Sequence, residues 1–242
     1  MEKAIIYQIF TRLFGNTNTT RKHNGTLTDN GCGKLNAFTP AVLRRIKELG
    51  ATHVWYTGVI RHATTTDYTR YGIPRQHPAV VKGNAGSPYA ITDYYDIDPD
   101  LATNVEKRMN EFESLVKRTH KAGLKMIIDF VPNHVARQYK STAKPKGIAD
   151  FGENDNTGMQ FSPQNNFYYC PEQSFAADID LYHGEELPYE EFPAKATGND
   201  CFGNRPGRND WYETVKLNYG VDYCDAGGVS THFSPTPDTW KK

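Results

Sequence analysis

The fold is decided at residues 124–134, which read LKMIIDFVPNH. The apolar run 124–128 predicts a short buried strand. It is followed at once by Asp129, Asn133 and His134. Ligands of parallel α/β proteins sit at the carboxyl ends of strands, and these three side chains can hydrogen-bond hydroxyls or bind a metal. The stretch is therefore either part of an active site or an ordinary polar turn, since Pro and Asn are common turn residues.

Two strands and a helix lie upstream of this stretch. Residues 4–10 are apolar nearly throughout, which predicts a strand covered on both faces. Thr39 and Pro40 make a good helix start, and apolar residues at spacings of about three and four predict a helix that Gly50 ends. A second strand is predicted at 52–57. The spacing is that of a βαβ unit with a right-handed crossover.

A long excursion and a second helix complete the lead-in. Residues 58–103 are rich in Tyr, Pro and Gly, and a structureless loop of that length is uncommon unless it is functional. Asn104 is predicted to cap a long amphipathic helix over 105–122, with its charged residues on a solvated face. Strand, helix, strand, helix and strand predict the opening of a parallel α/β domain in residues 1–134.

The alternation stops after this point. Residues 135–223 are rich in Gly, Asn, Pro and Tyr and predict an irregular insertion that can include a short sheet. Its acidic pairs, including 190–191, are interpreted as a solvated edge rather than an acid/base pair. Residues 224–242 predict a return to the α/β pattern, because Thr236 and Pro237 look like the start of a helix. A helix that begins so close to the last residue favours a truncated domain over a frayed tail.

Composition excludes several classes of function. The 242 residues carry 28 basic and 28 acidic side chains, which gives no electrostatic case for nucleic acid or an anionic membrane. No apolar run approaches the roughly 20 residues of a membrane helix. The N-terminus lacks a secretion signal, so we expect a cytoplasmic protein, or a secreted or periplasmic one if a signal was removed. The four cysteines form no CxxC pair, so a zinc site is not expected.

Three motifs together resemble the α-amylase family, glycoside hydrolase family thirteen. DFVPNH at 129–134 resembles the family's first conserved region, in which Asn and His follow a strand-end Asp. SPYAITDYYDIDP at 87–99 resembles a loop that supplies a sugar-stacking Tyr. VKLN at 215–218 is weakly similar to a motif near the end of the family's B-domain, because Lys216 stands where an acid is usual. The resemblance implies an α/β fold: a partial (β/α)8 TIM barrel with its first three strands and a B-domain inserted after strand three.

The resemblance also implies roles for four residues. Tyr89 would stack on the sugar ring where cleavage occurs, and His134 would hydrogen-bond the hydroxyls of that sugar. Asp129 would orient neighbouring side chains rather than attack the substrate. Asn133 would bind calcium, which prefers hard oxygen ligands. Each sugar or metal role has a plainer alternative: Tyr89 as a loop plug, His134 as a satisfied strand-end residue and Asn133 as a turn cap. Either Asp178 or Asp180, both in the insertion, is a candidate for a second ligand of the same calcium ion.

No catalytic residue is expected in this chain. Retaining glycosidases need two carboxyl groups about 5 Å apart. In the family that these motifs resemble, they lie on later barrel strands, which we expect after Lys242. The parent is expected to act on α-glucan oligosaccharides or starch, with its barrel completed by residues beyond 242. The 242-residue chain alone is expected to be inactive. The alternatives are a non-catalytic carbohydrate-binding protein, a transglycosylase or isomerase of the same family, or an unrelated α/β enzyme.

Overall fold

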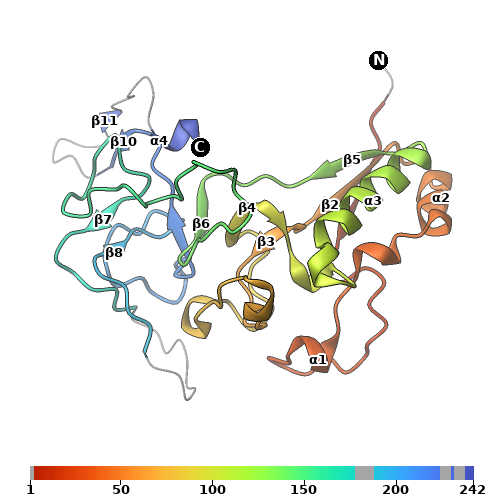
Figure 1. Cartoon of the computed structure of the whole chain (residues 1–242), viewed down its shortest axis with the longest axis horizontal. Helices are drawn as coiled ribbons and strands as arrows, with labels where there is room; N and C mark the ends of the chain where they lie inside the picture. The colour runs from red at the N-terminus through yellow and green to blue at the C-terminus, as the bar shows by residue number, and fades with distance from the viewer. Residues whose placement is uncertain (1–2, 178–187, 224–229, 232–237) are drawn as a thin grey trace.

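A parallel sheet forms one end of the molecule (Figure 1). The computed structural model describes residues 3–177, 188–223, 230–231 and 238–242. The sheet contains three strands in the order β1 (Ile6–Phe10), β2 (His53–Thr57) and β5 (Lys125–Ile128). Tyr56 of the central strand pairs with both Ile9 and Ile128. The three predicted strands are therefore confirmed, and the fold is α/β.

Helices α2 (Pro40–Glu48) and α3 (Arg108–Lys121) lie next to this sheet and contact each other. The Thr39 hydroxyl accepts a hydrogen bond from the amide of Val42 at 3.3 Å, as expected for an N-cap residue. The predicted cap of the second helix, Asn104, is confirmed, but the first turn of this helix is 3-10. Asn104 caps a short 3-10 helix, η5 (Val105–Lys107), and α3 begins only after it.

The helices cover the sheet incompletely. Leu43 of α2, Val54 of β2 and Leu115 of α3 are fully buried in one core. By contrast, Ile6 of β1 is 51% exposed and Ile128 of β5 is 39% exposed. The predictions that both outer strands are buried were therefore wrong. The physical reason is that apolar sequence predicts burial only where another element covers the strand.

The excursion between β2 and α3 is not structureless. It contains an antiparallel pair, β3 (Ile60–His62) with β4 (Ile91–Ile97), and short 3-10 helices. The guanidinium of Arg61 is buried and lies 3.1 Å from Asp93 and 2.9 Å from Asp96. Short helices η2 (Thr69–Tyr71), η3 (Pro78–Val80) and η4 (Pro99–Leu101) complete the segment, while α1 (Leu27–Asn30) and η1 (Leu35–Ala37) precede α2.

The insertion forms the other end of the molecule (Figure 1). It is built from short antiparallel pairs, so the predicted irregular region does contain sheet structure. The pairs are β6 (His134–Ala136) with β9 (Thr214–Lys216), β7 (Tyr169–Cys170) with β8 (Ala194–Lys195), and β10 (Val221–Asp222) with β11 (Ser230–Thr231). A short helix, α4 (Asp238–Lys241), follows. The predicted helix start at Thr236 and Pro237 lies outside the described residues.

One charged residue of the insertion corrects a prediction. Glu191 is not on a solvated edge: its carboxylate lies 2.6 Å from the guanidinium of Arg137, and both side chains are buried. Tyr189 also donates a hydrogen bond to it, at 3.0 Å. A pair of adjacent acids in the sequence cannot reveal that a distant arginine buries one of them. In the part of the chain that the structure describes, we find no helix with the length and apolar character to cross a membrane.

Candidate functional site

Asp129 is held in one orientation where β2 and β5 end. The indole Nε1 of Trp55 donates a hydrogen bond to one carboxylate oxygen. The amide of Gly58 donates to the other oxygen at 3.0 Å. Trp55 lies in β2 and Gly58 directly follows it, whereas Asp129 directly follows β5. Because both oxygens accept hydrogen bonds from donors of β2 and its end, the carboxylate has a fixed orientation.

Gly58 also brings the loop of Tyr89 to this edge of the sheet. Its φ of +75° favours glycine, and an added Cβ would lie 2.8 Å from the Cβ of Pro88. Tyr89 follows Pro88 and is partly exposed. Burial and the negative charge of Asp129 raise the pKa of the Tyr89 phenol. The phenol therefore lies within electrostatic reach of Asp129 at the carboxyl ends of β2 and β5.

His134 lies against the same loop. The whole residue is only 4% exposed. Its ring makes a hydrogen bond with the backbone of Tyr89. The other ring nitrogen, Nδ1, is buried and has no hydrogen-bond partner among the described residues. Burial lowers the pKa of His134, and the positive charge of Lys216, its partner across the β6–β9 pair, lowers it further. The ring is therefore neutral at pH 7.

The backbone between Asp129 and His134 is fixed from the outside. The phenol of Tyr94 donates hydrogen bonds to the carbonyls of Val131, at 2.7 Å, and His134, at 3.1 Å. The phenol of Tyr219 donates to the carbonyl of Pro132. Three carbonyls of this short turn are thus bound by two tyrosines from other elements. The turn is a rigid support for the side chains at its two ends.

Asn133 is not part of this group. Its exposed side chain lines a separate cavity of about 580 Å³, together with aromatic residues that include Phe130 and Tyr219. Among the described residues, no three His, Cys, Asp or Glu side chains form a cluster that could hold a metal. The predicted partners Asp178 and Asp180 lie outside the described residues. Asn133 itself supplies one neutral carboxamide oxygen.

Two aromatic residues of the site could not be identified from the sequence. Trp55 reads simply as a strand residue, yet it binds Asp129. Trp211 lies in the insertion, and its ring centroid is 5.2 Å from that of His134. Its one sequence signal is its position four residues before the VKLN motif. The contact itself joins positions far apart in the chain, which no local pattern encodes.

Comparison with known proteins identifies the family of this chain. The family model for the catalytic domain of alpha amylase matches residues 8–188. The chain therefore belongs to the alpha-amylase family, and its relatives include glycoside hydrolases. This confirms the family that the three sequence motifs resemble.

Individual relatives match only part of their own length. Trehalose-6-phosphate hydrolase of Bacillus subtilis is 32% identical over 139 residues, which cover 57% of this chain and 18% of that protein. Maltase A2 of Drosophila melanogaster is 28% identical over 174 residues, which cover 68% of this chain and 24% of that protein. An alpha-amylase from Lactobacillus plantarum, known from a crystal structure, is 28% identical in sequence with a TM-score of 0.39. The match covers 57% of this chain and 24% of that chain. The chain thus spans about a fifth of the length of these curated relatives.

Proposed function

We propose that this chain is the N-terminal part of a retaining, α-amylase-like glycosidase that acts on α-linked glucans such as starch or maltooligosaccharides. In this proposal Tyr89 and His134 bind one sugar ring and Asp129 orients the site. The observation that supports it best is the meeting of these three residues at the carboxyl ends of β2 and β5. Active sites of TIM barrels are built at that end of the strands.

The chemistry of each residue suits its proposed role. The phenol ring of Tyr89 offers an apolar face to the C–H groups of a sugar. The neutral imidazole of His134 can donate or accept a hydrogen bond with a hydroxyl. Asp129 accepts hydrogen bonds on both oxygens, which favours orientation over nucleophilic attack. The chain therefore offers a binding surface, and it leaves bond cleavage to other carboxylates.

We infer that those carboxylates lie on later strands of a barrel, of which this chain holds the first three. A closed TIM barrel has eight parallel strands. The exposed apolar residues of β1 and β5, such as Ile6 and Ile128, support this inference, since further elements would cover them. The short span of the chain relative to its relatives supports it as well. Residues 1–242 alone should then bind sugar without turnover.

Hydrolysis of maltotriose, followed by proton NMR, tests this proposal. An intact mass first identifies the molecule in the assay, since residues 1–242 account for 27.4 kDa. We expect the protein that the gene encodes to have a larger mass and to release the α-anomer first, because double displacement retains configuration. Residues 1–242 alone should release no sugar. Initial release of the β-anomer, or no hydrolysis of any α-glucan by the encoded protein, would contradict the proposal.

We also propose that Asn133 is a calcium ligand in the complete protein. Its carboxamide oxygen is a hard ligand of the kind that Ca²⁺ prefers. The exposed position of the side chain next to the aromatic cavity leaves it accessible to an ion and to ligands from other segments. No step of the reaction depends on this ion.

A further inference from the structure

His62 is a buried histidine of the excursion that is paired with a buried carboxylate. It lies in β3 and is 3% exposed, while Asp98 is 0% exposed. The ring Nδ1 lies 3.0 Å from Oδ2 of Asp98 and 3.3 Å from the carbonyl oxygen of Ile60. Both neighbours are acceptors, so Nδ1 carries a hydrogen in either charge state and the proton that titrates is the one on Nε2. Loss of that proton removes the charge of the ring and keeps its hydrogen bond to Asp98.

The Asp98 carboxylate joins β3 to the end of β4. Its Oδ2 also accepts a hydrogen bond from the amide of His62 at 3.4 Å, and its Oδ1 accepts one from the amide of Asp100 at 2.9 Å. The amide of Asp98 in turn donates to the carbonyl of Val59 at 2.9 Å, just before β3. The two strands therefore meet at this one buried side chain.

Residues 84–90, here called the Tyr89 segment, lie directly against the residues that follow His62. Two backbone hydrogen bonds hold the segment at its ends: from the amide of Ala63 to the carbonyl of Ala90 at 2.9 Å, and from the amide of Thr65 to the carbonyl of Asn84 at 3.0 Å. A Cβ added to Gly86 would lie 1.7 Å from the carbonyl oxygen of Ala63, so no side chain fits between the two backbones. A shift of the backbone at His62 is therefore passed on to Tyr89.

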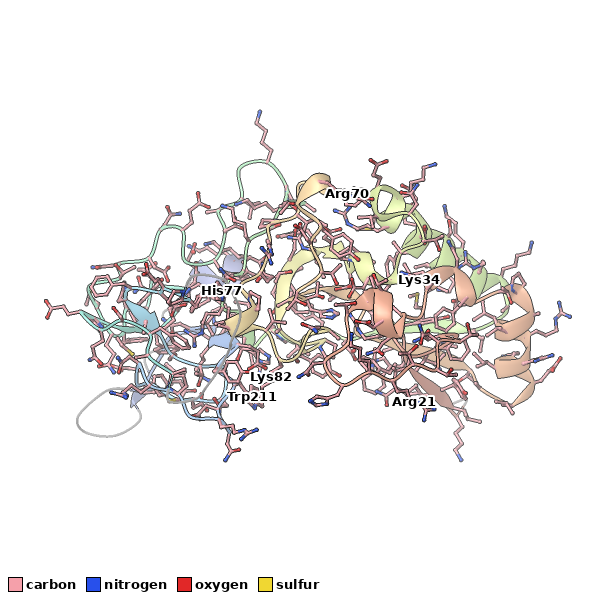
Figure 2. The ribbon with its side chains drawn as sticks, turned by 90° about the horizontal axis from the view of Figure 1, so that it is seen from below. Arg21, Lys34, Arg70, His77, Lys82 and Trp211 are labelled. Atoms are coloured by element: carbon pink, nitrogen blue, oxygen red, sulfur yellow. The ribbon has the colours of Figure 1, made fainter. Side chains whose placement is uncertain are left out.

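Charged and titratable groups from outside β3 face this pair. The guanidinium of Arg12, which follows β1, lies 2.7 Å from the Asp100 carboxylate, and the phenol of Tyr68 donates to the same carboxylate at 2.6 Å. The ammonium of Lys34 donates to the carbonyl of Asp100 at 2.5 Å, and Figure 2 shows Lys34 toward the end of the molecule that holds the parallel sheet. The thiol of Cys32 lies within electrostatic reach of both Arg12 and Asp100.

The environments of these groups separate their titrations. Burial disfavours the charged form of His62, but the Asp98 carboxylate raises the pKa above the ordinary 6.5. Nε2 is buried and has no hydrogen-bond partner among the described residues, which disfavours its proton and limits this rise. Burial raises the pKa of Tyr68 and raises that of Cys32 to about 11, while burial and the nearby carboxylates together leave the pKa of Arg12 raised. A charge change at moderately alkaline pH therefore belongs to His62 and not to Tyr68, Cys32 or Arg12.

We infer that the His62–Asp98 pair positions the Tyr89 segment, so that the sugar site binds tightly only while His62 carries its charge. This inference rests on the proposed function, to which it adds a positioning residue that does not touch the sugar. The ion pair draws β3 against the end of β4 and fixes the backbone on which the Tyr89 segment rests. Once the charge is lost, a buried carboxylate faces a neutral ring, and the backbone relaxes to bring other donors to it. Small shifts matter, because binding groups must be held within about 0.5 Å.

Binding of a neutral maltooligosaccharide from pH 6.5 to about 9.5 tests this role. Acarbose, a pseudo-oligosaccharide inhibitor, contains an amine that itself titrates, so the ligand is a thio-linked maltotriose, which resists hydrolysis. Isothermal titration calorimetry on the encoded protein should show an affinity about 3- to 10-fold weaker at the alkaline end. His134 stays neutral and the Tyr89 phenol stays protonated in this range, because the pKa of His134 is lowered and that of Tyr89 is raised.

Two variants assign the effect to the pair. His62→Asn places an amide NH₂ near the position of Nδ1 but takes up no proton, so it should bind at every pH as weakly as the wild type does at alkaline pH. Asp98→Asn should also flatten the profile, because without the carboxylate burial keeps His62 neutral, and it replaces His62→Asn if that variant does not fold. His53→Asn is the matched control. The His53 Nδ1 lies 2.7 Å from the Thr52 hydroxyl at the amino end of β2, and this variant should keep the wild-type profile.

Hydrogen exchange checks the positioning without a ligand or a variant. After correction for the intrinsic effect of pH, the protection of residues 84–90 should fall over the same pH range as the affinity. A flat wild-type affinity profile, a His62→Asn profile that falls in parallel with it, or constant protection of residues 84–90 would each overturn the inference. A wild-type protein that binds no maltooligosaccharide at any pH would contradict the proposed function, and the exchange of residues 84–90 would still test the positioning.

Discussion

At the residue scale, the site depends on a few groups that are held with little freedom. Asp129 accepts from Trp55 and Gly58, and the loop of Tyr89 approaches Gly58 so closely that no side chain fits there. The sequence motif identified Asp129, Tyr89 and His134 through a resemblance. It did not reveal Trp55, because a strand residue carries no local mark of the carboxylate it binds across the sheet.

Gly58→Ala should disturb both stability and sugar binding. The added methyl meets Pro88, and the φ of +75° becomes strained. Gly50→Ala is the matched control, because Gly50 has a φ of +86° but open space around it. Urea denaturation should show a loss of about 1 kcal/mol for Gly50→Ala from the backbone alone and a larger loss for Gly58→Ala. Acarbose affinity should fall only in Gly58→Ala, and equal stability losses in the two variants would refute the role of Pro88.

The pKa values of two buried histidines should be shifted in opposite directions. Burial disfavours the charged form of His62, but its pKa is raised because the Asp98 carboxylate lies 3.0 Å from its Nδ1. Burial lowers the pKa of His134. Histidine signals followed by NMR against pH, and assigned with His62→Gln and His134→Gln, should show protonation of His62 persisting above pH 6.5 and that of His134 only below it.

The stability consequences of these shifts have opposite signs. The His62–Asp98 pair stabilises the fold fully below the ordinary histidine pKa, and this contribution is lost as pH rises through the raised value. Neutral His134 contributes stability above its ordinary pKa, which is lost as pH falls through the lowered value. A titration in which the two histidines exchanged behaviour would show that the environments described above are wrong.

At the scale of elements, the sequence predicted what local chemistry determines. The Thr39 cap, the start of α2 and the three parallel strands follow from caps and apolar runs, and all are observed. The burial of Glu191 by Arg137 was missed, because it depends on residues far apart in sequence. Exposure of β1 was missed for a similar reason: a strand sequence shows what it can bury and not what covers it.

Arg61, Asp93 and Asp96 form a buried ionic cluster within the excursion, here called the latch, and hydrogen bonds from Arg61 join this latch to the insertion. Arg61 also donates to the carbonyl of Lys140 and the hydroxyl of Thr142, both at 2.7 Å. Arg61→Met would leave a buried carboxylate short of its partner, at a cost of about 3–5 kcal/mol in unfolding free energy. Urea denaturation measures this loss.

The control for the latch is an exposed ion pair of this chain. Lys22 lies 3.0 Å from Asp29, and its side chain is 60% exposed. Exposed pairs are screened by water, so Lys22→Met should leave the denaturation midpoint unchanged. If Arg61→Met were as stable as Lys22→Met, the buried charges of the latch would contribute nothing to joining the two segments.

At the scale of the whole molecule, the chain has two unlike ends. One end is a parallel sheet with two helices, and the other is a set of short antiparallel pairs (Figure 1). Tyr89, Asp129 and His134 lie where the two meet, and the ring of Trp211 in the insertion contacts that of His134. Apolar side chains of the sheet remain exposed, which fits the proposal that further barrel strands complete it.

Calcium should stabilise the complete protein through Asn133. Scanning calorimetry with and without a chelator should show a lower melting temperature without the ion, since a ligand that binds only the folded state stabilises it. Asn133→Ala should reduce this difference, because one oxygen ligand is lost. An unmutated protein whose melting temperature ignores the chelator would remove the calcium proposal without affecting the sugar-binding residues.

The most direct test of the sugar site is the affinity of the encoded protein for acarbose before and after Tyr89→Ala. The lost aromatic contact should weaken binding about tenfold or more. Tyr95→Ala is the control, because Tyr95 is an exposed tyrosine that lines the separate aromatic cavity. A clear loss in Tyr89→Ala with unchanged affinity in Tyr95→Ala is the predicted result. Equal affinity in the wild type and Tyr89→Ala would contradict the placement of a sugar ring on Tyr89.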